Sequence, residues 1–357
     1  MPRPRLDPRT PLTELHVHLG AAVTPAIMWG IAHAQGIRLP TKDYWAFRDL
    51  ITVGRRRRSF EAYLALFHWT ELIQSSPTAV ERSVYEVIGG AYRKNNITRL
   101  ELRFNPMKRN RGGEQDLDHI IAAAVRGMDR AVLEYPQVRA GLIFCLDRAF
   151  SYELNEIIAA KAVAWRDRGV VAIDIAGPVE PAFRFADYRD LSAQVRRAGL
   201  GVTVHAGETG GPDEVREAVE ALEPDRIGHG ISSTRDPRVM GMLRERGIVL
   251  EVCPSSNLNT RVVRTIAELK TIIRTLVDHE VRFALSTDGP EMLRSYLRDE
   301  IALLLRHEIL SFDEVLRTLE TAREASFLRL APVPGRSDEA REGATNGHAP
   351  IALEVEV

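Results

Sequence analysis

The stretch Thr13-Glu-Leu-His-Val-His-Leu19 alternates like a β-strand and carries two histidines, His16 and His18, at a spacing of two. Residues i and i+2 of a strand point to the same face, so both imidazoles leave one side and are close enough to share one ion. Imidazole is a frequent ligand of zinc and related transition metals. A solvated or buried histidine pair is the commoner explanation of H-x-H taken alone, so the rest of the chain has to decide.

Seven more short apolar stretches follow this first strand, which we place at 13–19. They cover residues 98–104, 139–146, 169–175, 201–205, 225–229, 247–253 and 281–287. Helical patterns precede, separate and follow them at 24–35, 60–74, 78–94, 115–134, 151–168, 185–198, 212–222, 235–246, 264–279, 297–309 and 312–329. Apolar strands that alternate with helices indicate parallel βα units. Eight such strands in a chain of this size predict an α/β fold, a single-domain (β/α)8 TIM barrel with extra helices.

The remaining segments give the predicted domain boundaries. Residues 1–11 contain four prolines and three arginines and predict a flexible N-terminal arm, followed by the barrel domain at 12–330. Residues 331–357 are rich in Pro, Gly, Ser and Glu and predict a disordered tail. Residues 37–58 read as irregular and end in Arg55-Arg-Arg-Arg58. This run has two interpretations, a solvated loop or an anion-binding lid over a negatively charged substrate.

The overall composition excludes several classes of protein. The 357 residues are 45% hydrophobic and carry a formal net charge of -1, which is unlike the basic footprint of a nucleic-acid-binding protein. Two cysteines, Cys145 and Cys253, argue against a disulfide framework and are expected to be inert buried thiols. The N-terminus lacks the apolar core of a signal peptide, and no apolar run is long enough to span a membrane. We expect a soluble cytoplasmic protein; its oligomeric state is left open.

The carboxyl ends of the predicted strands carry most of the ionisable residues. In a barrel of this type, catalytic residues stand at these ends. The residues found there are His16 and His18, Arg103, Asp174, His205 followed by Glu208, His229, Cys253 and Asp288. Three imidazoles and one carboxylate from this set would form a metal shell with a position left open for water.

Each of these residues also has an ordinary structural explanation. His205 fits a buried core histidine, Glu208 a charge at a helix N-terminus, and Asp288 a turn residue. Chance would, however, have to place such residues at four strand ends at once, which favours a site.

Seven motifs spread over residues 12–330 point to one family. They are Glu14-Leu-His-Val-His-Leu19, Glu101-Leu-Arg-Phe-Asn-Pro106, Asp174-Ile-Ala-Gly177, His205-Ala-Gly-Glu208, Arg226-Ile-Gly-His-Gly230, Cys253-Pro-Ser-Ser-Asn257 and Ser286-Thr-Asp288. In this order they resemble the adenosine deaminase-like zinc aminohydrolases of the amidohydrolase-type barrels. The ordered set is far more specific than any single motif.

The resemblance implies a role for each residue. One zinc ion per chain would be held by His16, His18, His205 and Asp288 and would activate a water. His229 would orient this water and take up its proton, and Glu208 would be the general acid toward the ring nitrogen beside the attacked carbon. The backbone of Gly177 would bind another ring nitrogen. The implied reaction converts a 6-aminopurine nucleoside, adenosine or an adenosine-like compound, to the 6-oxo product and ammonia. An activated water, a carboxylic acid and a second histidine are also what hydrolytic displacement of an amine requires.

Two positions depart from the family pattern. The first motif of adenosine deaminases usually continues with Asp-Gly, and that aspartate serves the ribose side, whereas this chain has Gly20-Ala21. The last motif usually has a second aspartate that contacts the imidazole side of the purine, whereas this chain has Gly289. Both missing aspartates are substrate contacts of the family, and no metal ligand or proton-transfer residue is missing. The resemblance therefore implies that the reaction is retained, while the identity of the substrate is left open.

The two glycines leave several substrates to consider. A modified, 5′-extended or anionic aminopurine fits the loss of two carboxylates, and free adenine is another candidate. A rival from another class is a metal-dependent hydrolase of a cyclic amide or ester. Against this rival, the chain has no lysine that could be carbamylated at the end of the fourth strand, where Asp174 stands. A non-enzymatic binding protein that kept the barrel is a further alternative, which the intact set of ligands, Glu208 and His229 disfavours.

Overall fold

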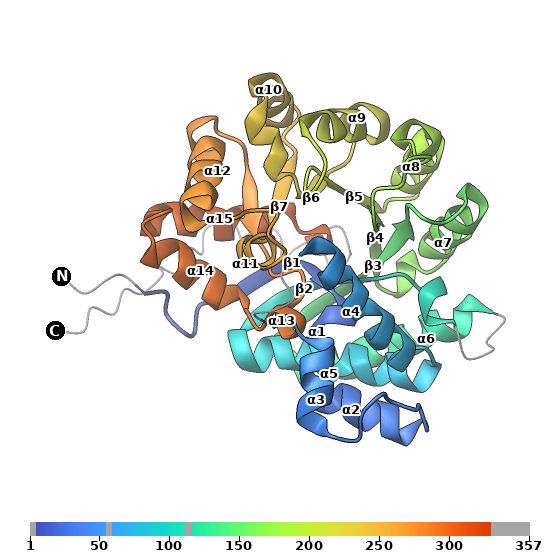
Figure 1. Cartoon of the computed structure of the whole chain (residues 1–357). Coiled ribbons are helices and arrows are strands. Elements are labelled where there is room, and N and C mark those ends of the chain that lie inside the picture. Colours follow the sequence, from blue (N-terminus) through green and yellow to red (C-terminus); the bar gives the residue numbers. More distant parts are fainter. Residues whose placement is uncertain (1–4, 55–58, 111–115, 330–357) are drawn as a thin grey trace, which may run out of the picture.

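Eight parallel strands, hydrogen-bonded in the order β1 to β8, form the centre of the computed structural model (Figure 1). They are β1 (Leu12–His18), β2 (Ile97–Phe104), β3 (Arg139–Asp147), β4 (Val170–Ala176), β5 (Gly201–Ala206), β6 (Arg226–His229), β7 (Val249–Val252) and β8 (Phe283–Leu285). The structure describes residues 5–54, 59–110 and 116–329. Each strand lies close to its predicted position, and the predicted TIM barrel is confirmed.

The barrel closes through the segment that follows β8. A single parallel bridge joins Val17 to Asp288. The His18 N–H donates to the Asp288 carbonyl at 2.9 Å, and the Asp288 N–H donates to the His16 carbonyl at 2.8 Å. Asp288 adopts a left-handed backbone conformation with φ of 63°. Closure therefore fixes Asp288 beside the two histidines of β1.

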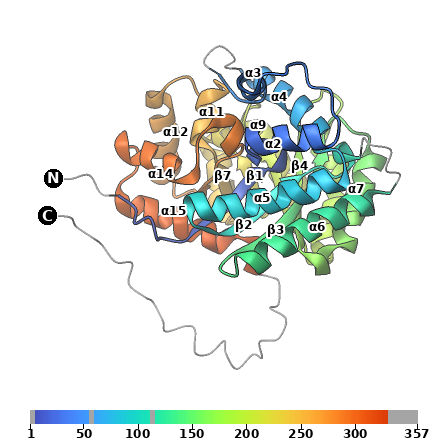
Figure 2. The ribbon, with the colours of Figure 1, turned by 90° about the horizontal axis from the view of Figure 1, so that it is seen from below.

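Helices surround the strands (Figure 1). They are α1 (Leu19–Ala22), α2 (Pro25–Ala34), α3 (Tyr44–Ile51), α4 (Phe60–Ile73), α5 (Pro77–Asn95), α6 (Leu117–Glu134), α7 (Tyr152–Ala164), α8 (Arg189–Arg197), α9 (Pro212–Leu222), α10 (Pro237–Glu245), α11 (Pro254–Asn259), α12 (Ile266–Asp278), α13 (Pro290–Leu293), α14 (Leu297–Arg306) and α15 (Phe312–Ala325). Short 3-10 turns are η1 (Met107–Arg109), η2 (Arg166–Arg168), η3 (Phe185–Tyr188), η4 (Ile231–Arg235) and η5 (Phe327–Arg329). Figure 2 shows α5 and α6 packed side by side against the barrel.

One prediction about the loops is wrong. Residues 37–58 were expected to be irregular, but Tyr44–Ile51 form α3. The Asp43 side chain caps this helix by accepting the Ala46 N–H at 2.8 Å. Phe47 is buried and its ring contacts that of Trp29, with centroids 5.2 Å apart. Capping and this aromatic contact stabilise a helix that the sequence pattern alone did not indicate.

Some predicted segments lie partly or wholly outside the described residues. The arginine run 55–58 and the predicted tail 331–357 fall outside them, as do residues 1–4 of the predicted arm. In the described part of that arm, the Arg298 guanidinium of α14 donates to the carbonyls of Asp7, Pro8 and Thr10 at 2.7–3.0 Å. Within the described ranges no helix combines the length and apolarity that crossing a membrane requires.

Candidate active site

A pocket of about 380 Å³ opens at the carboxyl ends of the strands. Its lining combines strand-end residues with one face of α4, which lies over the barrel in Figure 1. Residues singled out at the strand ends or as substrate contacts that line it are His18, Gly20, Arg103, Gly177, His205, Glu208, His229 and Asp288. Cys145, which was expected to be an inert thiol, lines it as well. His16 is fully buried beside this pocket. The positional expectation for a barrel site is therefore met, because residues from β1, β2, β4, β5, β6 and β8 converge at one mouth.

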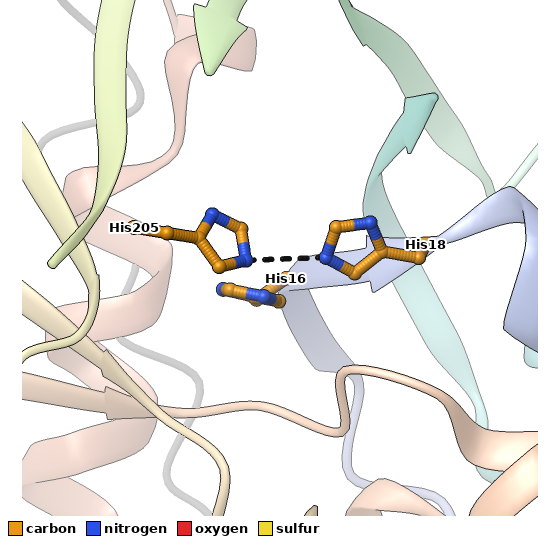
Figure 3. A group of neighbouring side chains, drawn as sticks. All are labelled: His16, His18 and His205. Atoms are coloured by element: carbon orange, nitrogen blue, oxygen red, sulfur yellow. Dashed lines mark hydrogen bonds between the residues drawn. The ribbon is translucent and has the colours of Figure 1, made fainter. Parts of the chain in front are cut away.

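The imidazoles of His16, His18 and His205 lie close together, as Figure 3 shows. Nitrogen atoms of His16, His18 and His205 all lie within 4.8 Å of one another, and the Nε2 atoms of His18 and His205 are 3.2 Å apart. The Asp288 Oδ1 atom lies 3.6 Å from His18 Nε2 and 4.0 Å from His16 Nε2. All four predicted ligands thus point at one small volume.

The far side of two of these rings is held by carboxylates. His16 Nδ1 lies 2.7 Å from Glu251 Oε2, and His205 Nδ1 lies 3.0 Å from Asp174 Oδ1. The carboxylates accept the hydrogen of Nδ1 in both rings, so Nε2 of each ring keeps a lone pair that points into the cluster. His16 Nε2 is buried and has no hydrogen-bond partner among the described residues.

The cluster fits a divalent transition metal. Burial lowers the pKa of both His16 and His18 well below the ordinary value, and neighbouring positive charges add to this effect, so the imidazoles are neutral as ligands must be. Three imidazoles and one carboxylate match the donor types that zinc prefers.

A buried arginine joins the two supporting carboxylates. Arg103, fully buried on β2, donates to Asp174 Oδ2 at 2.9 Å and to Glu251 Oε2 at 2.8 Å. Arg226 donates to the other oxygen of Glu251 at 2.6 Å. Although burial raises it, the pKa of Glu251 is brought down to about 2 by the two arginines. Glu251 was not among the residues predicted from the sequence, where its signal is a single carboxylate inside the apolar stretch 247–253.

Glu208 and His229 line the same pocket as His18 and His205, and the His229 ring lies 4.9 Å from that of His16 and 5.4 Å from that of His205. The closest approach of their side chains is 3.6 Å, between Glu208 Oε2 and His229 Nε2. Burial raises the pKa of Glu208 well above its ordinary value, and the nearby Asp288 carboxylate adds to this rise. Its Oε1 atom is buried without a hydrogen-bond partner in the described part of the chain. A protonated carboxyl with a free oxygen is suited to proton donation.

His229 has a left-handed backbone and a partner that sequence analysis did not assign. Its φ is 60°, and its Nδ1 atom lies 3.2 Å from Asn257 Nδ2. An amide group can present either its NH₂ or its oxygen, so Asn257 can support both the neutral and the protonated ring. Burial lowers the pKa of His229 well below the ordinary value, so the resting ring is neutral.

The three glycines predicted to contact substrate differ in what surrounds them. Gly177 has φ of 96°, a conformation that favours glycine, and it lines the pocket. A Cβ atom at Gly20 would lie 2.9 Å from the Phe67 ring and 3.1 Å from Arg109 Nη2. A Cβ atom at Gly289 would lie only 2.6 Å from the Tyr63 hydroxyl. The space that a side chain at residue 20 or 289 would need is therefore already filled, by Phe67 and Arg109 in the first case and by Tyr63 in the second.

Comparison with known proteins agrees with this geometry. The family described as adenosine deaminase matches residues 11–332. The chain is 30% identical over 317 residues to an adenosine deaminase of Clostridium kluyveri, covering 89% of each protein.

Solved structures share the fold. A Zn-bound amidohydrolase of Burkholderia ambifaria superposes with a TM-score of 0.76 at 22% identity, covering 94% of this chain and 88% of the other. An ADAL protein of Arabidopsis in complex with IMP also gives 0.76, at 23% identity, covering 93% and 94%. With the family match spanning nearly the whole described barrel, the chain belongs to the adenosine deaminase family of aminohydrolases.

Proposed function

We propose that this protein is a zinc-dependent hydrolytic deaminase that converts a 6-aminopurine nucleoside, adenosine or an adenosine-like compound, to its 6-oxo product and ammonia. The observation that carries the proposal is the convergence of four ligand atoms in the pocket that Glu208 also lines, with a raised pKa and a buried oxygen that has no partner among the described residues. Family membership and the relative from Clostridium kluyveri support the substrate class. The net charge of -1 supports a small-molecule substrate and no nucleic-acid partner, and we place the reaction in the cytoplasm.

One zinc ion per chain is proposed, held by His16, His18, His205 and Asp288. When bound, the metal supplies a Lewis acid that makes water a nucleophile near neutral pH. The Zn-bound structural neighbour supports the choice of metal. Glu251 and Asp174 hold two of the imidazoles in the orientation that the metal needs.

The proposed proton transfers use the chain's own groups. Glu208 donates its proton to the ring nitrogen beside the amine-bearing carbon, which makes that carbon electrophilic and avoids a ring anion. His229 orients the attacking water, accepts its proton and stabilises the charge that develops. The Gly177 N–H is assigned to another ring nitrogen. The proton that His229 took from the water then passes to the amine, which leaves as ammonia. As the carbonyl forms, the proton of the added hydroxyl returns to Glu208.

The sugar side of the pocket favours a modified or anionic substrate as the second candidate. The Arg109 guanidinium extends toward Gly20, so a cation lies where the family pattern has a carboxylate. Arg109 is buried and lines the pocket together with Lys108 and Arg148. Lys108 is paired with Asp147 and Arg148 with Glu214, and Arg109 also interacts within the protein. The specific observation for this candidate is therefore the place of the Arg109 guanidinium beside Gly20. The Arabidopsis neighbour was solved with a nucleotide.

A cyclic amide hydrolase with two bridged metals has less support. That mechanism needs a carbamylated lysine on the fourth strand, and Asp174 of β4 instead binds Arg103 and His205. A metal content of one per chain would agree with the deaminase and a content of two with the rival.

Ammonia release, measured together with the ultraviolet change from 6-aminopurine to 6-oxopurine, tests the proposal. The zinc-loaded protein is given adenosine, free adenine, the nucleotide and 5′-extended analogues. We expect turnover of at least one aminopurine. A preference for anionic or extended analogues would support the second candidate, and a clear preference for plain adenosine would refute it.

A further inference from the structure

Tyr63 lies at the pocket wall beside the end of β8. It comes from α4, is only 4% exposed, and lines the pocket together with Glu208 and Asp288. Its hydroxyl oxygen is 2.6 Å from the position that a Cβ atom of residue 289 would take. The hydroxyl therefore stands in the space that a side chain at residue 289 would enter.

This hydroxyl is not explained by packing inside the protein. Its polar neighbour inside the protein is the Asp288 carboxyl, which is close enough for each group to shift the pKa of the other. No described atom, however, lies at the distance and angle of a hydrogen bond to this hydroxyl. Its ring packs edge-on against Phe67, with centroids 5.5 Å apart, a contact that phenylalanine would make equally well. A buried polar group without a partner is destabilising by about 1–3 kcal/mol, so such groups usually meet a ligand or water.

The barrel topology places Tyr63 across the pocket from Glu208. Gly289 follows β8, beside β1, whereas Glu208 follows β5. Strands β1 and β5 are four places apart in the eight-stranded order, so they lie on opposite sides of the barrel. The histidine cluster lies between them, because His16 and His18 come from β1 and His205 from β5.

The shape of a 6-aminopurine then decides which atom faces which side. The reacting carbon is flanked by ring nitrogen N1 on one side and by the carbon that bears N7 on the other. With the reacting carbon at the cluster and N1 at Glu208, the N7 edge points to the opposite wall. N7 is a hydrogen-bond acceptor, and a tyrosine hydroxyl at neutral pH is a donor.

We infer that Tyr63 is a specificity-determining residue of this pocket, and that its hydroxyl donates a hydrogen bond to N7 of the aminopurine. This inference rests on the proposed function, and it assigns to α4 a substrate contact in place of the carboxylate that Gly289 lacks. Ala21 agrees with this arrangement, because its Cβ atom is 2.8 Å from the same position and further closes the space to a side chain at residue 289.

The test compares the competitive inhibition constants of the 6-oxopurine product and of its 7-deaza analogue, in which carbon replaces N7. The zinc-loaded wild type should bind the product about tenfold more tightly than the analogue, the value of one buried hydrogen bond. In Tyr63→Phe this ratio should fall to about one. Tyr188→Phe is the matched control, since Tyr188 is equally 4% exposed but lies on η3 away from the pocket lining; its ratio should equal that of the wild type.

Three results would overturn the inference. They are a Tyr63→Phe ratio that stays at the wild-type value, a ratio that falls equally in Tyr188→Phe, and a wild type that binds both ligands equally. The last comparison needs no variant, so it applies even if Tyr63→Phe does not fold. Failure of the proposed function is recognised separately, because the wild type would then release ammonia from no aminopurine, and this inference would fall with it.

Discussion

Replacing Arg103 with glutamine should weaken metal binding and destabilise the fold together. The guanidinium bridges Asp174 and Glu251 at 2.9 and 2.8 Å in a fully buried position, and it also donates to the Leu15 carbonyl at 2.6 Å. A glutamine amide is shorter and uncharged, and it cannot bridge both carboxylates. Asp174 would lose the cation that, with His205, holds its pKa below the ordinary value against the effect of burial.

The magnitude follows from the bonds that are lost. Removing one partner of a buried ion pair costs about 3–5 kcal/mol of unfolding free energy. Two hydrogen bonds to charged groups, at about 1.5–3 kcal/mol each, give a similar figure. Both carboxylates also orient proposed metal ligands, and loss of such support lowers metal affinity by about 10–100-fold.

Arg226→Gln provides the matched control. Arg226 is also buried on a barrel strand, and its carboxylate partners are Glu251 at 2.6 Å and Glu101 at 2.5 Å, so this change leaves the Asp174–His205 pair intact. We expect both variants to lose similar stability in urea unfolding of the metal-free proteins. Competition with a chromophoric chelator should show the larger loss of zinc affinity in Arg103→Gln. Equal zinc affinity in the two variants would refute the role assigned to Arg103.

Three further predictions follow from the same structure. Glu208→Gln should lower kcat by about 10²–10⁴-fold while zinc content by elemental analysis stays at the wild-type level, and unchanged turnover would refute the acid role. Burial raises the pKa of Glu300 to about 7, so the folded state holds this proton more tightly than the unfolded state, and stability falls as pH rises from about 4.5 to 7. Urea unfolding across this window should show a decline in the wild type that is smaller in Glu300→Gln by up to about 3 kcal/mol, and parallel pH curves would contradict this. Gly289→Ala should lower unfolding free energy by about 1–3 kcal/mol, because the new methyl group overlaps the Tyr63 hydroxyl, and an unchanged urea midpoint would contradict it.

The sequence was sufficient to predict the barrel and the residues at its mouth. Each of the eight strands is a short apolar stretch, which identifies the barrel. The catalytic residues of a TIM barrel lie at the carboxyl ends of these strands, which identifies the residues at its mouth. The positions of His205 and Asp288 relative to His16 follow from that rule. Their spacing in the sequence alone would not have brought them together.

Other parts of the site depend on contacts that no local pattern encodes. Glu251 is separated from its partners His16 and Arg103 by 235 and 148 residues, so a single carboxylate in an apolar strand gave no sign of them. Tyr63 reaches the pocket from α4, which the rule about strand ends does not cover. The helix α3 begins at a local signal, the Asp43 cap, but its buried face is defined by packing against α2, which the local sequence does not show.

The most direct test of the account is ammonia release by the zinc-loaded protein from the panel of aminopurines, read together with the zinc content per chain. The account predicts turnover of at least one 6-aminopurine with one zinc ion bound, and loss of both turnover and zinc after chelation. Absence of ammonia from every aminopurine, in protein that holds its zinc, would contradict it.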